Sequence, residues 1–265
     1  MEIIKISKVR LAYFTPIMLT RTLVYNIAFG VGKGLPNEQY NLTSVKERER
    51  LHTLAEDELL IAALPTFGGR APVMEPPLFR NLRGSNTPAV VMVTYGARGY
   101  DDTLLETQAI LHEQGFVVFA GAAFITRHAL SPLVGQGRPN MQDTQTARAF
   151  AQQVLETLEG AEQMEAYTGF PGNTPYKPLP PPSGLTPTTN EKCVLCMQCF
   201  RWCPVDAIPY NDPNHTVAGR CILCHGCIVR CPVKARTVED EGFRQRVAQL
   251  EETCAGLAPE PELFI

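Results

Sequence analysis

The chain has 265 residues, which is long enough for one large domain or two domains of ordinary size. Its 24 basic and 27 acidic residues give a net charge of −3, and this near-neutral balance indicates neither a nucleic-acid nor a membrane-surface partner. No segment approaches the ~20 apolar residues of a membrane span, and residues 1–6 do not resemble a signal peptide, so we expect a cytoplasmic protein.

Residues 1–165 are predicted to form a first domain in which apolar runs alternate with amphipathic segments. The predicted strands are residues 9–15, 59–64, 89–94 and 116–123, with a weaker candidate at 40–44. The predicted helices are residues 21–31, 101–114 and 142–158. Continuous apolar strands separated by helices predict a parallel sheet that is covered on both faces. Five such strands fit a doubly wound α/β domain with strand order 2-1-3-4-5.

A sheet of this order binds its ligand outside the carboxyl ends of the first, third and fourth strands. The segments "PTFGGRAP" and "TYGARGYDD" follow the third and fourth strands, and each combines glycine with an aromatic residue. Glycine lets the backbone approach a ligand closely, and an aromatic side chain can stack on a flat ring. The alternative is that both are ordinary turns. The candidate ligand-binding residues of these two loops are Thr66, Phe67, Gly68, Gly69, Tyr95, Gly96, Ala97, Arg98 and Tyr100.

The composition changes after the first domain. Residues 166–189 are rich in proline and glycine and predict a semi-extended linker or a strap that wraps the protein. The cysteine region, residues 190–238, follows. Residues 239–265 predict an acidic helix and tail, which we interpret as a solvated face.

The cysteine region contains eight of the nine cysteines, and the first of them is Cys193. Two segments, "CVLCMQCFRWCP" and "CILCHGCIVRCP", repeat the pattern C-x-x-C-x-x-C-x-x-x-C-P. In such a repeat, three thiolates hold one 4Fe-4S cluster and the fourth ligates the other cluster. The first predicted ligand set is Cys193, Cys196, Cys199 and Cys231. The second is Cys221, Cys224, Cys227 and Cys203.

Zinc knuckles are the alternative reading of the C-x-x-C pairs, but zinc ribbons need only two pairs, and the third and fourth cysteines of each repeat would then be left over. Cys254 lies outside the repeat and is interpreted as a plain free thiol.

The cysteine region resembles bacterial-type two-cluster ferredoxins, which are small α+β domains. The whole chain resembles the flavodoxin–ferredoxin fusion proteins of anaerobic bacteria and archaea. This resemblance is carried by "YGARGYDDTLLETQAILHEQGFVVFAGAAFI", by "GRPN" near Gly137 and by the cysteine repeats. It implies an FMN-binding, flavodoxin-like domain that passes electrons to or from two 4Fe-4S clusters.

The segment after the first strand departs from the pattern of the family. Flavodoxin phosphate loops resemble T/S-x-T-G-x-T, in which hydroxyls and backbone N–H groups at a helix N-terminus hold the FMN phosphate. The counterpart here is Thr15, Pro16, Ile17, Met18, Leu19 and Thr20. Ile17 replaces the middle hydroxyl and Met18 replaces the glycine, and together these changes cost on the order of 3–5 kcal/mol of phosphate binding. We expect a weakened FMN site.

Three functions remain open at this stage. The first is an electron carrier that couples FMN to the clusters. The second is an iron–sulfur carrier whose first domain lacks FMN and binds a partner or another ligand. The third is a flavin-dependent reductase of an unknown substrate, for which His128, near the rim of the cleft, is interpreted as a surface residue. A redox partner protein is expected; the direction of electron flow and the oligomeric state are not indicated.

Overall fold

The computed structural model describes residues 4–265 except residues 33, 36, 180 and 182. Outside the described residues lie residues 1–3, which belong to the segment that we compared with signal peptides, and two prolines of the predicted linker. None of the helices in the described part of the chain is long and apolar enough to cross a membrane.

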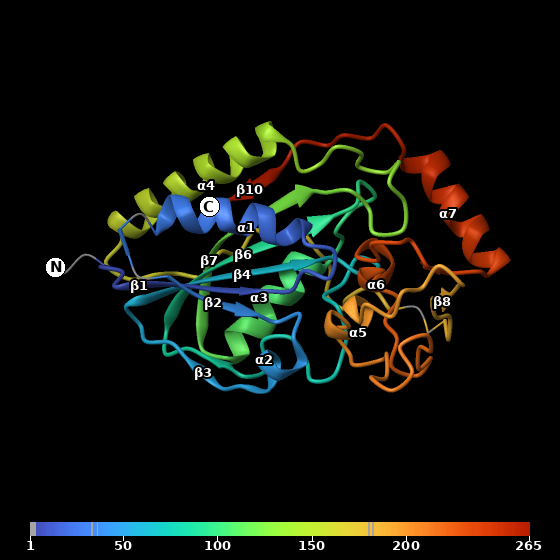
Figure 1. Ribbon diagram of the computed structural model, residues 1–265. Coiled ribbons are helices and arrows are strands. Elements are labelled where there is room, and N and C mark those ends of the chain that lie inside the picture. Colours follow the sequence, from blue (N-terminus) through green and yellow to red (C-terminus); the bar gives the residue numbers. More distant parts are fainter. Residues whose placement is uncertain (1–3, 33, 36, 180, 182) are drawn as a thin grey trace.

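A six-stranded sheet forms the centre of the first domain, in the order β10-β7-β6-β4-β1-β2 (Figure 1). Its strands are β1 (Lys8–Tyr13), β2 (Asn37–Asn41), β4 (Glu58–Pro65), β6 (Thr87–Tyr95), β7 (Phe116–Ile125) and β10 (Glu262–Phe264). The first five pair in parallel. Numbered along the chain, these five have the order 2-1-3-4-5, which confirms the predicted doubly wound arrangement.

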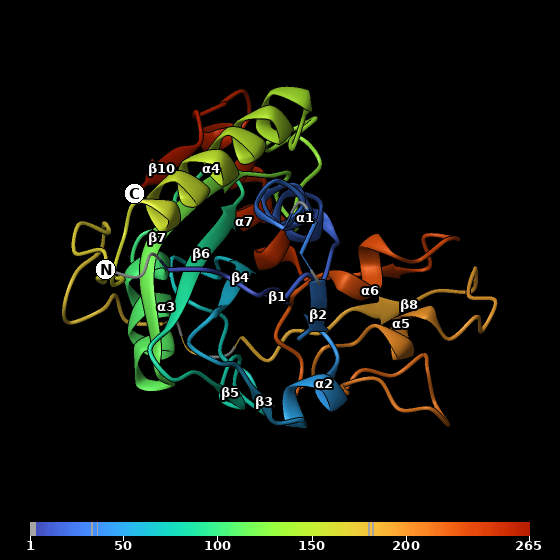
Figure 2. The ribbon, with the colours of Figure 1, turned by 90° about the vertical axis from the view of Figure 1, so that its left-hand side faces the viewer.

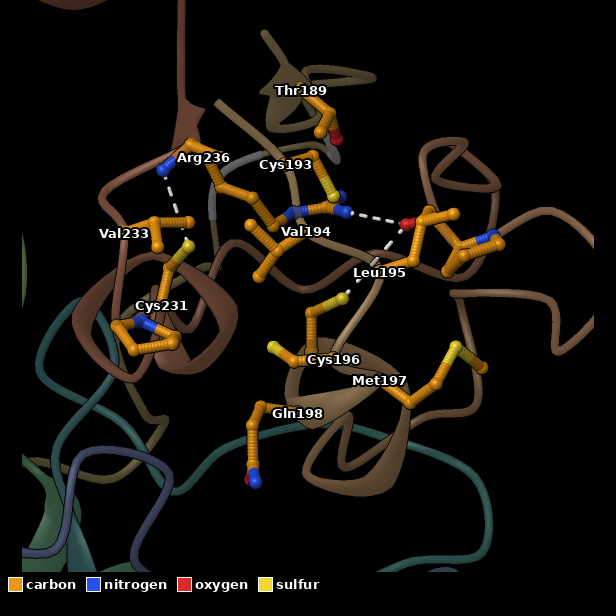
Figure 3. A pocket seen from close by; sticks show the side chains of 14 residues that line it. Thr189, Cys193, Val194, Leu195, Cys196, Met197, Gln198, Cys231, Val233 and Arg236 are labelled. Carbon is orange, nitrogen blue, oxygen red and sulfur yellow. Dashed lines mark hydrogen bonds between the residues drawn. The ribbon is translucent and has the colours of Figure 1, made fainter. Parts of the chain in front are cut away.

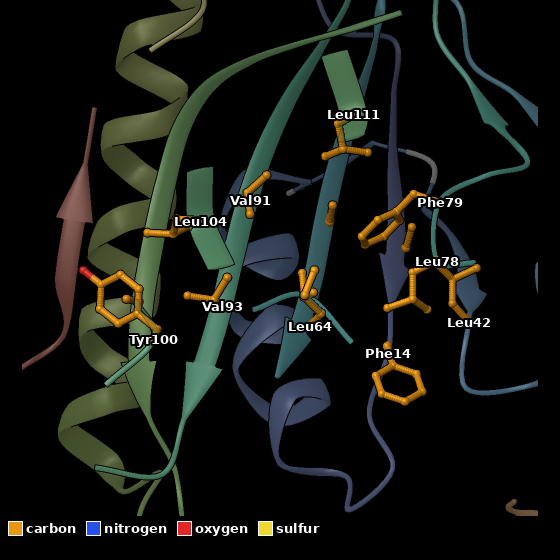
Figure 4. Close-up of a cluster of buried hydrophobic side chains, with 14 of the residues drawn as sticks. Phe14, Leu42, Leu64, Leu78, Phe79, Val91, Val93, Tyr100, Leu104 and Leu111 are labelled. Atoms are coloured by element: carbon orange, nitrogen blue, oxygen red, sulfur yellow. The ribbon is translucent and has the colours of Figure 1, made fainter. Parts of the chain in front are cut away.

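Helices cover both faces of this sheet. Helices α1 (Leu19–Val31) and α4 (Met141–Glu159) lie on one face, and α3 (Thr103–Glu113) lies on the other (Figures 1 and 2). Helices α1 and α4 pack closely because Gly30 has no side chain: a Cβ there would lie 2.4 Å from the Cβ of Ala151. On the α3 face, Leu104 and Leu111 pack with Val91 and Val93 of β6 (Figure 4). The continuous apolar strands are therefore buried on both sides.

Two predictions were wrong at the C-terminus: the sheet has six strands instead of five, and the tail contributes a strand, β10, instead of forming only a solvated face. Strand β10 pairs antiparallel with β7, with Leu263 opposite Ala122. Leu263 packs with the α1/α4 face, while Phe264 packs with the α3 face. A three-residue strand is too short for its alternation to be recognised in an acidic, proline-containing segment. The tail helix, α7 (Glu241–Cys254), is present, and Asp240 caps it by accepting a hydrogen bond from the Phe243 N–H at 2.6 Å.

Residues 167–177, here called the strap, lie against the first domain. Phe170 packs over Gly121, where a Cβ would come within 2.5 Å of its ring. Asp102 accepts hydrogen bonds from the backbone N–H groups of Asn173 (2.8 Å) and Lys177 (2.6 Å). These bonds lower the pKa of Asp102. The sequence left open whether residues 166–189 form a semi-extended linker or a strap that wraps the protein. Residues 167–177 fit the strap.

Several short elements complete the chain. They are α2 (Val45–Glu49), β3 (His52–Thr53), β5 (Leu82–Arg83), β8 (Thr188–Thr189), α5 (Gln198–Arg201), α6 (Gly226–Val229) and β9 (Arg236–Thr237). Strands β8 and β9 pair antiparallel at the two ends of the cysteine region. Figure 1 shows this region next to the carboxyl ends of the sheet strands.

Candidate functional site

The first cysteine set surrounds one cavity. Cys193, Cys196 and Cys199 line it together with Cys231, which comes from the other repeat (Figure 3). The remaining wall includes Val194, Leu195, Pro213, Pro232, Val233 and Arg236. The fold thus brings together the four thiols that the spacing assigned to one ligand set, and it surrounds them mainly with apolar side chains.

The second cysteine set also forms one neighbourhood. It consists of Cys203, Cys221, Cys224 and Cys227. Burial is the main cause that raises the pKa of Cys227 to about 11; Arg236 opposes the shift, and Cys221 and Cys203 add to it. Burial likewise raises the pKa of Cys224, and the other three thiols of the set add to the shift. A bound metal would reverse this preference for the neutral thiol, because it stabilises the thiolate directly. All nine cysteines, each of them described, are free of disulfides.

The two repeats have the same local backbone. Left-handed φ values recur at equivalent positions, in Leu195 and Leu223, in Met197 and His225, and in Asp206 and Lys234. The fourth cysteine of each repeat accepts a hydrogen bond from the N–H four residues later: Ala207 to Cys203 Sγ, and Ala235 to Cys231 Sγ, both at 3.2 Å. N–H donors aimed at sulfur stabilise a thiolate and tune a cluster that it ligates.

Within the described ranges, no group of three Cys, His, Asp or Glu side chains is arranged to hold one metal ion, and the four thiols of the first set line one cavity.

A second cavity, of about 210 Å³, lies at the carboxyl ends of β1, β4, β6 and β7; we call it the edge pocket. It is lined by Pro16, Ile17, Pro65, Thr66, Phe67, Gly68, Thr94, Tyr95, Gly96, Thr126, Arg127, His128, Ala129, Leu130, Leu223 and Cys224. Its position matches the ligand site expected for a doubly wound sheet. One wall, however, comes from the cysteine region, and Cys224 belongs both to this wall and to the second cysteine set.

The edge pocket contains seven of the fifteen predicted ligand-binding residues. These are Pro16, Ile17, Thr66, Phe67, Gly68, Tyr95 and Gly96. The other eight do not line it: Thr15, Met18, Leu19, Thr20, Gly69, Ala97, Arg98 and Tyr100. Of the loop after β7, the sequence placed only His128 near the rim of the cleft, and it did not predict the contribution of Leu223 and Cys224. The loop after β7 was predictable, because it follows a parallel strand at the same edge; the wall from the cysteine region was not.

Structural roles account for several of the predicted residues outside the pocket. Tyr100 is buried, and its hydroxyl donates to Glu262 Oε2 at 2.9 Å, which ties this loop to β10. Gly69 lies against Asp101, whose Cβ would be 2.8 Å from an added methyl group. Arg98 is exposed. Arg70, which follows Gly69 in the same loop, forms a bidentate ion pair with Glu106 at 2.7 and 2.8 Å.

The hydroxyls of the predicted phosphate loop are used within the protein. Thr20 Oγ1 lies 2.8 Å from Thr94 Oγ1 in a buried pair. Thr15 Oγ1 accepts from the Arg21 N–H at 3.4 Å. Met18 precedes α1 with φ 71°, the left-handed conformation that a glycine would adopt at lower cost. The loop therefore keeps the backbone form of a glycine position without presenting these two hydroxyls to a ligand.

His128 is partly buried in the wall of the edge pocket, which corrects its interpretation as a surface residue. It packs on Gly96, where an added Cβ would come within 2.3 Å of the imidazole. Its Nδ1 accepts from the Leu130 N–H at 3.1 Å, which leaves the proton on Nε2. Burial lowers the pKa of His128 to about 4, and the nearby charge of Arg98 contributes. The imidazole is therefore neutral at physiological pH.

Two arginines join the cysteine region to the first domain. Arg230 donates from Nε to the Pro16 carbonyl at 2.9 Å, and it also stacks on Trp202 with its guanidinium carbon 4.0 Å from the ring centre. Arg48 of α2 donates to the carbonyl of Pro204, the residue after Cys203. The phosphate-loop segment and α2 thus hold the second cysteine set against the sheet edge.

Solved flavodoxin structures are similar to a part of this chain that covers 57% of it. A flavodoxin from the domain Archaea is 14% identical and covers 57% of this chain and 98% of its own, with a TM-score of 0.41. Flavodoxin 2 from Bacillus cereus is 14% identical over 57% of this chain and 99% of its own, with a TM-score of 0.38. No protein-family description and no curated protein sequence matches the chain. The assignment of the fold rests on the strand order of the sheet itself.

Proposed function

We propose that this protein transfers electrons through two 4Fe-4S clusters and exchanges them with a flavin held in the edge pocket. One observation carries the proposal: Cys224 belongs to the second cysteine set and also lines the edge pocket. A ring bound there would lie against a cluster ligand. The cluster of the first cysteine set would be the next centre for an electron that leaves the second cluster. The two clusters would lie close together, because the fourth ligand of each cluster comes from the other repeat.

The surroundings of the first cysteine set support an anionic cluster. Arg236 is only 4% exposed and lines this cavity. Its Nη1 donates to the Pro213 carbonyl at 2.9 Å, its Nη2 contacts Thr216 and the Pro187 carbonyl, and its Nε has no partner among the described residues. A buried cation that meets only neutral oxygens is costly unless a negative group lies close by. A cluster with four thiolate ligands supplies that charge.

The edge pocket supports the ring of a flavin better than its phosphate. Phe67 and Tyr95 provide aromatic surface, and Gly68 and Gly96 let the backbone approach a flat ligand. Pockets for ligands of this size usually measure about 300–1,000 Å³, so the 210 Å³ here fits part of FMN. Thr15 and Thr20 are buried and do not line the pocket, so the phosphate end lacks these two hydroxyl donors.

A bound flavin would supply a centre that accepts two electrons together and releases them singly. The chain itself positions that centre and limits its access to water. Pro16, Ile17, Leu130 and Leu223 form apolar walls of the pocket, and His128 can offer its Nε2 proton to a ring acceptor. The neutral state of His128 keeps it a donor without adding charge beside the second cluster.

The test is anaerobic isolation of the full chain followed by measurement of iron, acid-labile sulfide and acid-released flavin. We expect iron and sulfide for two clusters, together with flavin that is bound weakly and is regained by soaking in excess FMN. Isothermal titration should give a micromolar FMN affinity, as expected from a loss of about 3–5 kcal/mol at the phosphate. Zinc in place of iron would overturn the cluster assignment.

A second candidate is favoured by the engaged loop hydroxyls and the small volume of the pocket. In this case the protein is an iron–sulfur carrier whose edge pocket binds a partner segment or a ligand without a phosphate group. Protein that contains both clusters but binds neither FMN nor riboflavin would support this candidate and reject the flavin.

A further inference from the structure

Arg48 is the largest fully buried side chain among the described residues, at 2% exposed. It lies on α2 of the first domain, and its guanidinium meets only carbonyl oxygens within hydrogen-bonding distance. The acceptors are those of Leu42 (2.7 Å), Thr43 (3.4 Å), Glu75 (3.4 Å), Pro76 (2.9 Å) and Pro204 (2.5 Å). No carboxylate of the described residues lies within ion-pair distance of it.

The nearest charged groups do not compensate the buried positive charge of Arg48. Asp206 and Glu49 act on Arg48 from a distance, and both are exposed to solvent, which screens them. Burial lowers the pKa of Arg48, and Asp206, Glu49 and Cys203 oppose that shift. An isolated buried cation costs several kcal/mol unless it is compensated. The remaining group near this guanidinium is Cys203, one residue before the Pro204 carbonyl that Arg48 holds.

We infer that Arg48 is the charge partner of the second cluster: a positioning residue, contributed by the first domain, that stabilises the cluster held by Cys203, Cys221, Cys224 and Cys227 in its reduced form. This inference rests on the proposed presence of clusters. Reduction adds one electron to the cluster and makes it more negative, so a fixed buried cation favours the reduced state. Arg48 therefore raises the reduction potential of the second cluster relative to that of the same cluster without the cation.

Arg236 offers a matched comparison. It is buried to a similar extent, it also donates mainly to carbonyls, and it lines the cavity of the first cysteine set. Each set therefore has one buried guanidinium, Arg48 from the first domain and Arg236 from the cysteine region. Arg236 also acts on Cys227 and Cys221, so its influence extends over both sets. Arg48 holds the carbonyl of Pro204 next to Cys203, and we expect its effect to be confined to the second cluster.

The experiment is a dithionite titration of the full-length, anaerobically reconstituted protein, with both clusters followed by electron paramagnetic resonance. Arg48→Met keeps an unbranched apolar stem and removes the charge, and Arg48→Lys keeps the charge and removes the planar fork. R48M should move one of the two reduction waves to lower potential and leave the other in place. R48K should leave both waves close to their wild-type positions. Cys196→Ser identifies which wave belongs to the first cluster.

A second readout separates charge from packing. The melting temperatures of R48M and wild type are compared with and without iron, as a thermodynamic cycle. We expect R48M to lose more stability in the loaded protein than in the chelated protein, because only the loaded form contains the opposing charge. Equal losses in both forms would mean that Arg48 acts only through its carbonyl hydrogen bonds, and would overturn the inference.

Failure of the inference is distinguishable from failure of the proposed function. If wild-type protein lacks iron and sulfide for two clusters, the proposed function fails, whatever Arg48 does. If both clusters are present and both waves of R48M coincide with wild type, only the role of Arg48 is overturned. If R48M does not accumulate in loaded form, Arg48→Gln replaces it as the neutral variant: a fall of one wave that R48K does not show supports the charge role, and unchanged waves overturn it.

Discussion

Met18 shows at the scale of one residue how a ligand loop can keep its shape and lose part of its chemistry. The sequence predicted that a glycine position had been replaced, and φ 71° at Met18 confirms that the backbone there is left-handed. A side chain in this conformation costs about 1–2 kcal/mol. The Thr20–Thr94 hydroxyl pair could not be foreseen, because it joins residues 74 positions apart.

Restoring the two replaced residues should restore phosphate binding. We expect Ile17→Thr combined with Met18→Gly to strengthen FMN binding by about 1.5–3 kcal/mol, roughly ten- to a hundredfold, because one hydroxyl donor to the phosphate is added. Met18 already has φ 71° without a ligand, so removing its left-handed strain should stabilise the fold and not the complex. Riboflavin, which has no phosphate, is the matched ligand and should gain little. Isothermal titration with both ligands tests this; an equal gain for riboflavin would show that the variant acts on the ring and not on the phosphate.

At the scale of elements, long apolar runs were predictable and short pairings were not. Strands β4, β6 and β7 and helices α1, α3 and α4 lie within a few residues of their predicted bounds. Each carries enough buried positions for its period to be recognised. Helix α2, strands β3 and β5, and β10 have two to five residues each, and tertiary contacts determine them. The position of Cys224 in the pocket wall also depends on a tertiary contact, between the cysteine region and the first domain, and could not be predicted from the sequence.

The strap gives an element-scale prediction. Gly121→Ala should destabilise the protein by about 1–3 kcal/mol, because the added methyl group would lie 2.5 Å from the ring of Phe170 and displace it from the sheet. Gly219→Ala is the control, since an added Cβ there has open space around it. Circular dichroism melts of both variants measure the effect. A stable G121A protein would show that the strap is not anchored by this contact.

The whole molecule is asymmetric with respect to its two cysteine sets. The second set lies between the first domain and the rest of the cysteine region, held by Arg48 and Arg230. In the first set, Cys196 is the one exposed cysteine of the nine, all of which the structure describes, and Val194 and Leu195 beside it are more than half exposed. Electrons would therefore leave or enter by the first cluster and reach the edge pocket through the second.

This asymmetry predicts unequal reactivity toward small reagents. On anaerobic incubation with a ferrous chelator, we expect iron release in two phases, with the first cluster lost faster because solvent reaches Cys196. Electron paramagnetic resonance during the time course identifies which cluster disappears. Arg230→Ala, which loosens the cover at Pro16, should accelerate the slow phase and leave the fast phase unchanged. Simultaneous loss of both clusters from wild type would contradict the proposed arrangement.

Strand β10 covers an edge of the central sheet that would otherwise be open. Residues 121–123 of β7 would otherwise be an open margin of apolar backbone, with unpaired N–H and C=O groups available to any extended peptide. The last residues of the chain occupy that margin, and Glu262 fastens them through Tyr100. Strand β10 therefore leaves no free backbone edge at residues 121–123 of β7 to which another extended segment could add.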